Sequence, residues 1–186
     1  MVAKAVVTRS ADAQGMRSDV PYDACVPAAR TPVIDAGLAD FLQGQVSALL
    51  ATTDATAVPD ATRVNGLVAL DGHRLRVLIA DDATTARANA TPGARVAVLV
   101  TNMISYRSIQ LKGSVLLASP ARTPGDLALV HHHVSTFVGT SPAVGIDPAL
   151  ADRFFAVEVV PLVVEVDALF DQTPGPGAGR RMEVGR

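Results

Sequence analysis

The chain has 186 residues and 49% hydrophobic side chains, which is enough for one substantial core and too short for two independent domains. Sixteen basic and eighteen acidic side chains leave a net charge of -2 without a long basic block, which argues against a nucleic-acid partner. No apolar run approaches the roughly 20 residues of a membrane-spanning helix, and the N-terminus lacks the pattern of a secretory signal. The sequence therefore predicts a cytoplasmic protein without a membrane partner.

Cysteine content and the two ends of the chain set further limits. Cys25 is the only cysteine, so the chain can form neither an internal disulfide nor a cysteine-based metal site. Residues 1–30 show no apolar period, and we expect an N-terminal extension that lies on the domain or is partly disordered. Residues 31–170 form the predicted folded domain, and residues 171–186 form a tail rich in glycine and proline.

The folded domain begins with a short helix, since Asp35 is a good N-cap and Gly44 stands where the helix should end. After this helix, most of the predicted elements of the folded domain are strands. The Asp71-Gly72 dipeptide between the second and third strands is a strong hairpin signal, and Pro161 indicates a bulge or an edge position in the last strand. The predicted strands are residues 46–54, 61–70, 73–80, 95–102, 105–118 and 156–169.

Three further helices are predicted between these strands. Residues 81–93 read as a short helix with an acidic, threonine-rich start, and DPALADRFF starts another at Asp147. The clearest helix spans Thr123 to Val138, ending at Gly139, because four apolar residues recur at helical spacing. These are Leu127, Val130, Val134 and Phe137.

The strand at residues 105–118 is the longest and has two distinct faces. Polar positions alternate with the apolar residues Ile109, Leu111 and Val115, so one face packs the core and the other is free to meet a ligand or a subunit. The polar face carries Tyr106, Ser108, Gln110, Lys112 and Ser114. Many short antiparallel strands with few aromatic residues favour a mainly β fold, a closed or partly closed β-barrel with flanking helices.

Three segments together resemble a known family: VSALLATTD in the first strand, TRV in the second and YRSIQLKG in the fifth. In this combination the chain resembles the pyridoxamine 5'-phosphate oxidase-like, FMN-binding split-barrel family over about residues 36–170. The resemblance implies a six-stranded antiparallel split barrel that forms a homodimer, with FMN in a groove between the subunits. It also implies an FMN-dependent oxidoreductase acting on a small-molecule substrate. The chain has no tryptophan, which argues against authentic pyridoxamine phosphate oxidation.

Family positions suggest which residues would hold the flavin. Arg63 matches an arginine at the start of the family's second strand, where its guanidinium would approach the flavin phosphate. Ser108 stands where the family has a glutamine, and Gln110 and Lys112 are its nearby substitutes. The residues expected to line the ring or the substrate side are Tyr106, Arg107, Ser108, Gln110 and Lys112. No catalytic side chain is assigned.

The phosphate site departs most from the family pattern, which has a serine followed by arginine and lysine. Here Thr84 and Thr85 stand at the start of a short helix, with Arg87 one turn on as a counter-charge. Asp81 and Asp82 precede them, and two carboxylates oppose a phosphate dianion unless they point away and cap the helix. This acidic pair favours an alternative, a split-barrel dimer that has lost flavin and acts as a small-molecule binding protein.

Two minor alternatives concern other cofactors, haem bound through a histidine and a deazaflavin in place of FMN. Three adjacent histidines, His131 to His133, fan around a helix at about 100° each and cannot converge on one ion, so we expect no metal site. We expect His131 to be partly buried and the other two to be exposed. The TPGPGAG segment is expected to be flexible or to clasp a neighbouring subunit.

Overall fold

The computed structural model describes residues 33–156 and 158–183, so the expected extension at residues 1–30 lies outside the described residues. The elements, in chain order, are α1 (Ala36–Leu42), β1 (Val46–Thr53), β2 (Pro59–Ala69), β3 (Arg74–Ala80), α2 (Thr84–Asn89), β4 (Arg95–Asn102), β5 (Ser108–Ala118), α3 (Pro124–Thr140), a 3-10 turn (Ser141–Val144), α4 (Pro148–Asp152), β6 (Val159–Asp171) and β7 (Arg180–Arg181). Among the described residues, no helix has both the length and the apolar character needed to cross a bilayer.

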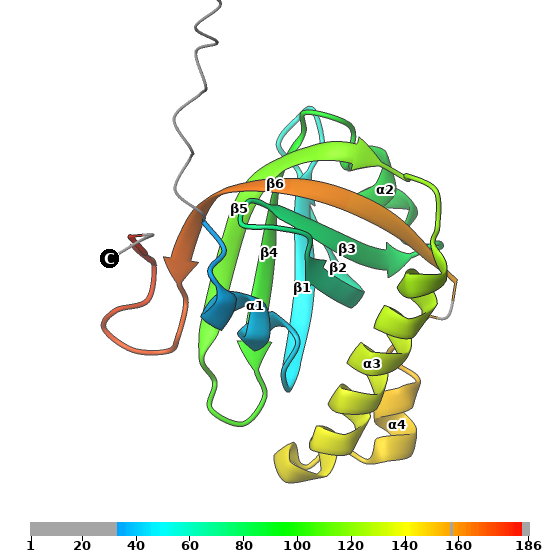
Figure 1. Ribbon diagram of the computed structural model, residues 1–186, viewed down its shortest axis with the longest axis vertical. Helices are drawn as coiled ribbons and strands as arrows, with labels where there is room; N and C mark the ends of the chain where they lie inside the picture. Colours follow the sequence, from blue (N-terminus) through cyan, green and yellow to red (C-terminus); the bar gives the residue numbers. More distant parts are fainter. Residues whose placement is uncertain (1–32, 157, 184–186) are drawn as a thin grey trace, which may run out of the picture. The chain divides into compact units, whose positions relative to one another are not determined.

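Six antiparallel strands close into a barrel, and helices flank it (Figure 1). The hydrogen-bonded order is β3-β2-β1-β4-β5-β6, and a further pairing of β3 with β6 closes the ring. The strand β7 was not predicted. It pairs with the end of β6, because the glycine-rich loop before it folds back onto Asp171. The predicted mainly β fold, a six-stranded antiparallel split barrel, is confirmed.

The core fills the inside of the barrel, where every second residue of each strand points. In β1, Val46, Ala48 and Leu50 are almost fully buried, and the residues between them are partly or fully exposed. Leu111 on β5 and Val164 on β6 face them at 1% exposure. Burying each large aliphatic side chain contributes roughly 1.5–3 kcal/mol, so this alternation fixes which face of β1 points outward.

Local sequence signals explain where the elements begin. The carboxylate of Asp35 accepts a hydrogen bond from the Leu38 amide at 2.7 Å, which caps α1 as predicted. The carboxylate of Asp71 accepts from the amides of His73 and Arg74, both at 2.8 Å, which fixes the turn between β2 and β3. The Thr123 side chain and Asp126 form a capping box at the start of α3.

Two residues let β6 complete the barrel. Pro161 pairs with Leu78 of β3. The pairing of β6 with β5 extends only to Leu162, so the missing amide proton of Pro161 removes no hydrogen bond between β6 and β5. Gly113 of β5 lies against the backbone of β6, where an added Cβ would overlap the carbonyl oxygen of Glu165. The register between β5 and β6 shifts at this point, as expected for a sharp corner of a barrel.

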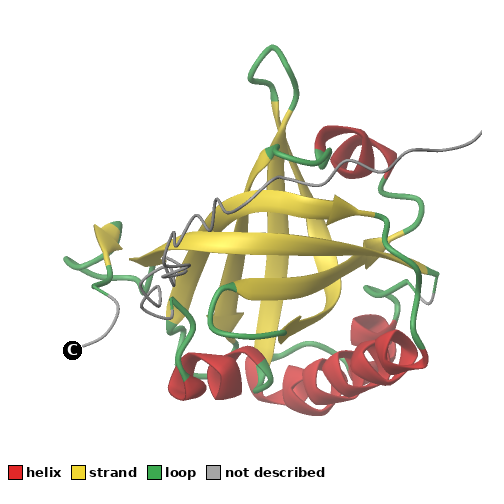
Figure 2. Cartoon of the chain, turned by 45° about the horizontal axis from the view of Figure 1, so that its top comes forward, coloured by secondary structure: helices red, strands yellow, loops and turns green. Residues whose placement is uncertain are grey.

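The long helix α3 packs on the outside of β2 (Figure 2). It continues past Gly139, where the sequence predicted its end, and the left-handed residue Gly145 (φ 77°) follows its final 3-10 turn. The predicted apolar stripe is only partly buried, since Leu127 is 44% exposed. The prediction for the histidines is wrong, because His133 is buried at 4% exposure whereas His131 is exposed. His133 follows Val130 by three residues and precedes Phe137 by four, so it lies on the buried stripe of α3.

We expect Gly113→Ala to lower the free energy of unfolding by about 3 kcal/mol, because β5 and β6 must separate to admit the methyl group. Urea denaturation followed by circular dichroism measures the change. Gly139→Ala is the matched control, since no atom lies within 4 Å of its added Cβ. That control should be neutral or stabilising by up to about 1 kcal/mol, as expected for an exposed helical glycine. Equal effects of the two substitutions would contradict the close approach.

The buried imidazole of His133 predicts a loss of stability in acid. Burial, followed by the charges of His132 and Arg63, lowers the pKa of His133 from 6.5 to about 4. As pH falls from about 6.5 to about 4, His133 becomes protonated in the unfolded chain but not in the folded one. The free energy of unfolding therefore falls by up to about 3 kcal/mol. We expect His133→Leu to remove this loss between about pH 7 and about pH 4. His131→Leu, a change at an exposed neighbour, should retain it; the reverse pattern would exclude His133.

Candidate functional site

The outer face of the barrel brings predicted residues from distant segments into one line. Strand register aligns six residues directly across β2, β1, β4, β5, β6 and β7, which we call the cross-strand row: Arg63, Leu49, Leu99, Gln110, Phe170 and Arg181. Arg63 and Gln110 are separated by three strand spacings, about 14 Å. Because adjacent positions such as Leu50 and Val98 are fully buried, the row itself points outward.

Next to this row lies a line of small residues. Five residues on β2, β1, β4, β5 and β6 align, each paired with the next: Ala61, Ala51, Ala97, Lys112 and Ala168. The short alanine side chains leave a hollow of about 270 Å³, which Ala51, Ala97 and Lys112 line together with the side chain of Arg95. A flat, mostly apolar surface of this kind suits the face of a planar ring.

Arg63 is a half-buried cation at one end of the cross-strand row. Its guanidinium lies over three phenylalanine rings of the α3–α4 region, at 5.2 Å from Phe154, 5.5 Å from Phe155 and 5.7 Å from Phe137. Its hydrogen bond to the Ser47 hydroxyl is long, at 3.5 Å. Burial lowers the pKa of Arg63, and in the part of the chain that the structure describes no carboxylate lies within ion-pair distance of it.

The other end of the row carries two more cations around an aromatic ring. The Lys112 ammonium lies 4.6 Å from the centroid of Phe170. Arg181 of β7 stands directly opposite Phe170, so its side chain shares that face. Neither cation forms an ion pair within residues 33–156 and 158–183. Arg95 differs, since its guanidinium is held by the carboxylate of Asp167.

The predicted phosphate site at α2 has the wrong charge. Thr84 and Thr85 line a cavity of about 170 Å³ with Thr62, but Asp60 and Asp82 also line it, and no basic side chain does. Two carboxylates beside a dianion oppose its binding.

The helix α2 also lacks the expected cap and the expected free cation. Its N-cap is Ala83, with no side-chain hydrogen bond, so the expectation that Asp81 or Asp82 caps it is wrong. The Asp81 carboxylate is instead bound by Arg87, which donates to it at 2.9 Å and to the Asp81 carbonyl oxygen at 2.5 Å. The structure therefore does not bring Arg87 or Arg63 into the α2 cavity.

Three further predicted residues lie at or beside the tip of the β4–β5 hairpin. Tyr106 has a left-handed backbone (φ 59°) and precedes β5, so it does not share the polar face of the strand. Arg107 folds over the ring of Phe41 at 4.7 Å. The buried hydroxyl of Ser108 is used internally, since it donates to the Tyr106 carbonyl oxygen at 3.0 Å and lies 2.9 Å from the Thr101 hydroxyl. Of the fifth-strand set, Gln110 and Lys112 remain on the outer face.

Sequence reasoning missed three residues that contribute to these sites. Asp60 lies just before the TRV segment, and nothing in the sequence predicted that it would line the cavity at α2. Phe170 and Arg181 lie on either side of the glycine-rich loop, and their pairing depends on that loop folding back. The dipeptide Arg180-Arg181 was visible as a small basic pair, but only the register places one of its side chains on the row.

Comparisons with known proteins bear on the fold. No protein-family model matches the sequence, and no curated protein matches it. HupZ of Group A Streptococcus is 14% identical at a TM-score of 0.50, covering 78% of this chain and 99% of HupZ. A putative pyridoxamine 5'-phosphate oxidase from Lactobacillus delbrueckii is 13% identical (76% and 97% covered, TM-score 0.48), and an F420 reductase is 22% identical (70% and 93%, TM-score 0.41). At such identities the similarity concerns architecture alone. The chain thus has a six-stranded barrel architecture similar to that of HupZ.

Proposed function

We propose that this protein is a homodimeric flavoprotein, an FMN-dependent oxidoreductase that binds its cofactor on the outer face of the barrel. One observation carries the proposal. Three cations without ion-pair partners among the described residues lie on that face: Lys112 lies within the line of alanines, and Arg63 and Arg181 stand at the two ends of the neighbouring cross-strand row. An uncompensated, partly buried guanidinium gains most from a charged ligand, because a charge-assisted hydrogen bond replaces lost hydration.

The residues of the outer face fit FMN, whereas those of α2 do not. A phosphate at Thr84 and Thr85 would meet Asp60 and Asp82 without a counter-charge. A phosphate at Arg63 would meet a cation whose own carboxylate partner is missing among the described residues. We therefore assign the phosphate to Arg63, which keeps the sequence prediction for that residue and replaces the one for α2.

The remaining roles follow from side-chain chemistry on the two adjacent rows. The Gln110 amide and the Lys112 ammonium are donors for the oxygens of a heteroaromatic ring, and Leu49 and Leu99 offer apolar contact beside them. The flavin would supply hydride transfer with a small-molecule substrate, and no side chain is needed as a nucleophile. The protein's part is to bind and orient, and to set the charge around the ring.

The proposal includes a second subunit because the hollow is too small by itself. Its volume of about 270 Å³ lies below the range of roughly 300–1,000 Å³ that encloses a drug-sized ligand. Leu49, next to Arg63 in the cross-strand row, is 39% exposed. A second copy laid on this face would cover that side chain and form the other wall of the groove.

The second candidate is a flavin-free binding protein on the same barrel. It is supported by the two carboxylates of the α2 cavity, Asp60 and Asp82, which repel the phosphate at the family's usual position.

The haem alternative has less support. The unpartnered Nε2 of His133 is buried, with the Phe155 ring 5.8 Å away, and in the described part of the chain no three His, Cys, Asp or Glu side chains gather as a metal site. A deazaflavin would use the same outer face as FMN.

The first test is whether the purified chain binds flavin. We expect it to carry or take up FMN with a flavin absorption spectrum, to quench FMN fluorescence in a saturable titration, and to sediment as a dimer. A haem-type spectrum would favour the haem alternative. The absence of both spectra, together with no saturable FMN binding, would reject the proposed function and leave the flavin-free binding protein.

Arg63→Ala should weaken FMN binding by roughly 10- to 150-fold, the loss expected for hydrogen bonds to a charged group, and leave the affinity for riboflavin unchanged. Riboflavin lacks the phosphate, so it separates anion binding from ring binding. Arg74→Ala is the matched control, because Arg74 lies at the β2–β3 turn, outside both rows of the outer face, and is already paired with Asp71. Its effect on FMN affinity should stay within about threefold. Equal losses for FMN and riboflavin in Arg63→Ala would remove the phosphate from Arg63.

A further pair of variants tests the assignment at α2. If the phosphate lies at Arg63, Thr85→Ala should leave FMN affinity within about threefold of the unchanged protein. If the phosphate lay at α2, Asp82→Asn would strengthen FMN binding by removing a repulsive charge, and Thr85→Ala would weaken it. Isothermal titration with FMN measures both. The second pattern would contradict our assignment.

A further inference from the structure

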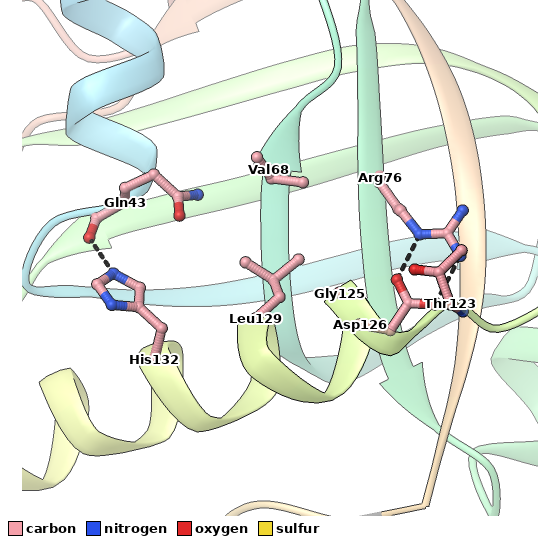
Figure 3. A pocket seen from close by; sticks show the side chains of 8 residues that line it. All are labelled: Gln43, Val68, Arg76, Thr123, Gly125, Asp126, Leu129 and His132. Carbon is pink, nitrogen blue, oxygen red and sulfur yellow. Dashed lines mark hydrogen bonds and ion pairs between the residues drawn. The ribbon is translucent and has the colours of Figure 1, made fainter.

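A cavity of about 380 Å³ lies between α1 and α3, over β2 and β3, away from the outer face described above (Figure 3). Val68 of β2 and Leu129 of α3 form its apolar walls. Gln43 and His132 close one end, and Arg76 and Asp126 close the other. We call it the α3 cavity. Its volume lies within the roughly 300–1,000 Å³ of small-molecule sites.

Two fixed contacts hold the α3 cavity open. Gly66 lets α3 approach β2 closely, since a Cβ added there would come within 3.2 Å of Leu129 and 3.4 Å of its backbone. Nearer the start of α3, Arg76 and Asp126 bridge the helix to β3 by hydrogen bonds of 2.5 and 2.7 Å, with side chains only 13% and 3% exposed. The helix is thus fixed at two points with a gap between them, so the cavity is formed before any ligand arrives.

The charge of the α3 cavity selects a neutral ligand. The Asp126 carboxylate stays ionised because the hydrogen bond from Arg76 lowers its pKa, and it neutralises the Arg76 guanidinium in turn. Arg76 also donates to the Ala121 carbonyl oxygen at 3.1 Å. An ionic ligand would have to break this pair, whereas a neutral one leaves it intact.

The Gln43 end of the α3 cavity offers a hydrogen-bond acceptor. The Gln43 amide points toward Val68 (Figure 3), and its Nε2 is already used, since it donates to the Leu67 carbonyl oxygen at 2.5 Å. Its Oε1 therefore remains as a hydrogen-bond acceptor at the cavity wall. The His132 imidazole lies beside it and donates from Nε2 to the Gln43 carbonyl oxygen at 3.0 Å, which holds this end closed.

We propose that the α3 cavity is a second binding site, for a small neutral aromatic molecule that carries one N–H or O–H donor. The apolar walls take the ring, and Gln43 Oε1 accepts from the donor. The inference does not rest on the proposed flavin site, because the two share no side chain.

Indole is the probe, titrated into the full chain without flavin and followed by amide chemical shifts in NMR. We expect saturable shifts at Gly125 and Leu129, with a dissociation constant of about 1 mM or tighter. 1-Methylindole, which lacks the N–H donor, should bind about tenfold more weakly. Absence of saturable shifts at these amides would overturn the site, and equal affinity for the two probes would overturn the role of Gln43.

Two blocking variants complete the test. Gly125→Phe fills the cavity from α3, where an added Cβ meets only the Thr123 hydroxyl at 3.6 Å, and Val68→Phe fills it from β2. Each should weaken indole binding by about tenfold or more. Val58→Phe is the matched control at a valine that is 58% exposed, and it should stay within about twofold. Unchanged binding in either folded blocking variant would overturn the proposal.

Discussion

The pairing of β3 with β6 is the constraint on which this structure depends. It closes the sheet into a ring, and closure decides for every strand which side faces the core and which faces outward. The pairing is possible because Pro161 lies where β5 no longer needs its amide, and because Gly113 lets β5 and β6 approach at the corner. An open sheet with the same strands would not hold the two ends of the cross-strand row at fixed distance and on one face.

Charge pairing then separates structural cations from candidate ligand-binding ones. Arg76, Arg87 and Arg95 each have a carboxylate within hydrogen-bond distance. These pairs hold α3 against β3, fix the start of α2, and link β4 to β6 across β5. Arg63 and Lys112 have aromatic rings beside them instead. A cation on a ring face keeps its charge available to a ligand, whereas an ion-paired one must first give up its partner. This difference moves the proposed phosphate contact from α2 to the outer face.

The helix α3 divides the molecule into two regions with different chemistry. Toward its end it places Phe137 against Arg63, so the helix is part of the wall of the proposed flavin face. Toward its start it stands off β2 and leaves the neutral α3 cavity. Two contacts fix the first half of the helix, the close approach of Leu129 to Gly66 and the ion pair of Arg76 with Asp126. A ligand in the α3 cavity would therefore contact the same helix that holds the Phe137 ring beside Arg63.

The sequence by itself determined the fold class, the six barrel strands to within about three residues, the Asp35 cap and the Asp71-Gly72 turn, because these depend on period and on local hydrogen bonds. It also placed Gln110 and Lys112 on one face of the fifth strand. Tertiary structure decided the rest: that Asp60 meets α2, that Arg87 turns to Asp81, and that Arg181 joins the row. These contacts join residues whose spacing carries no signal, since only the closed barrel and the returning loop set the distances between them.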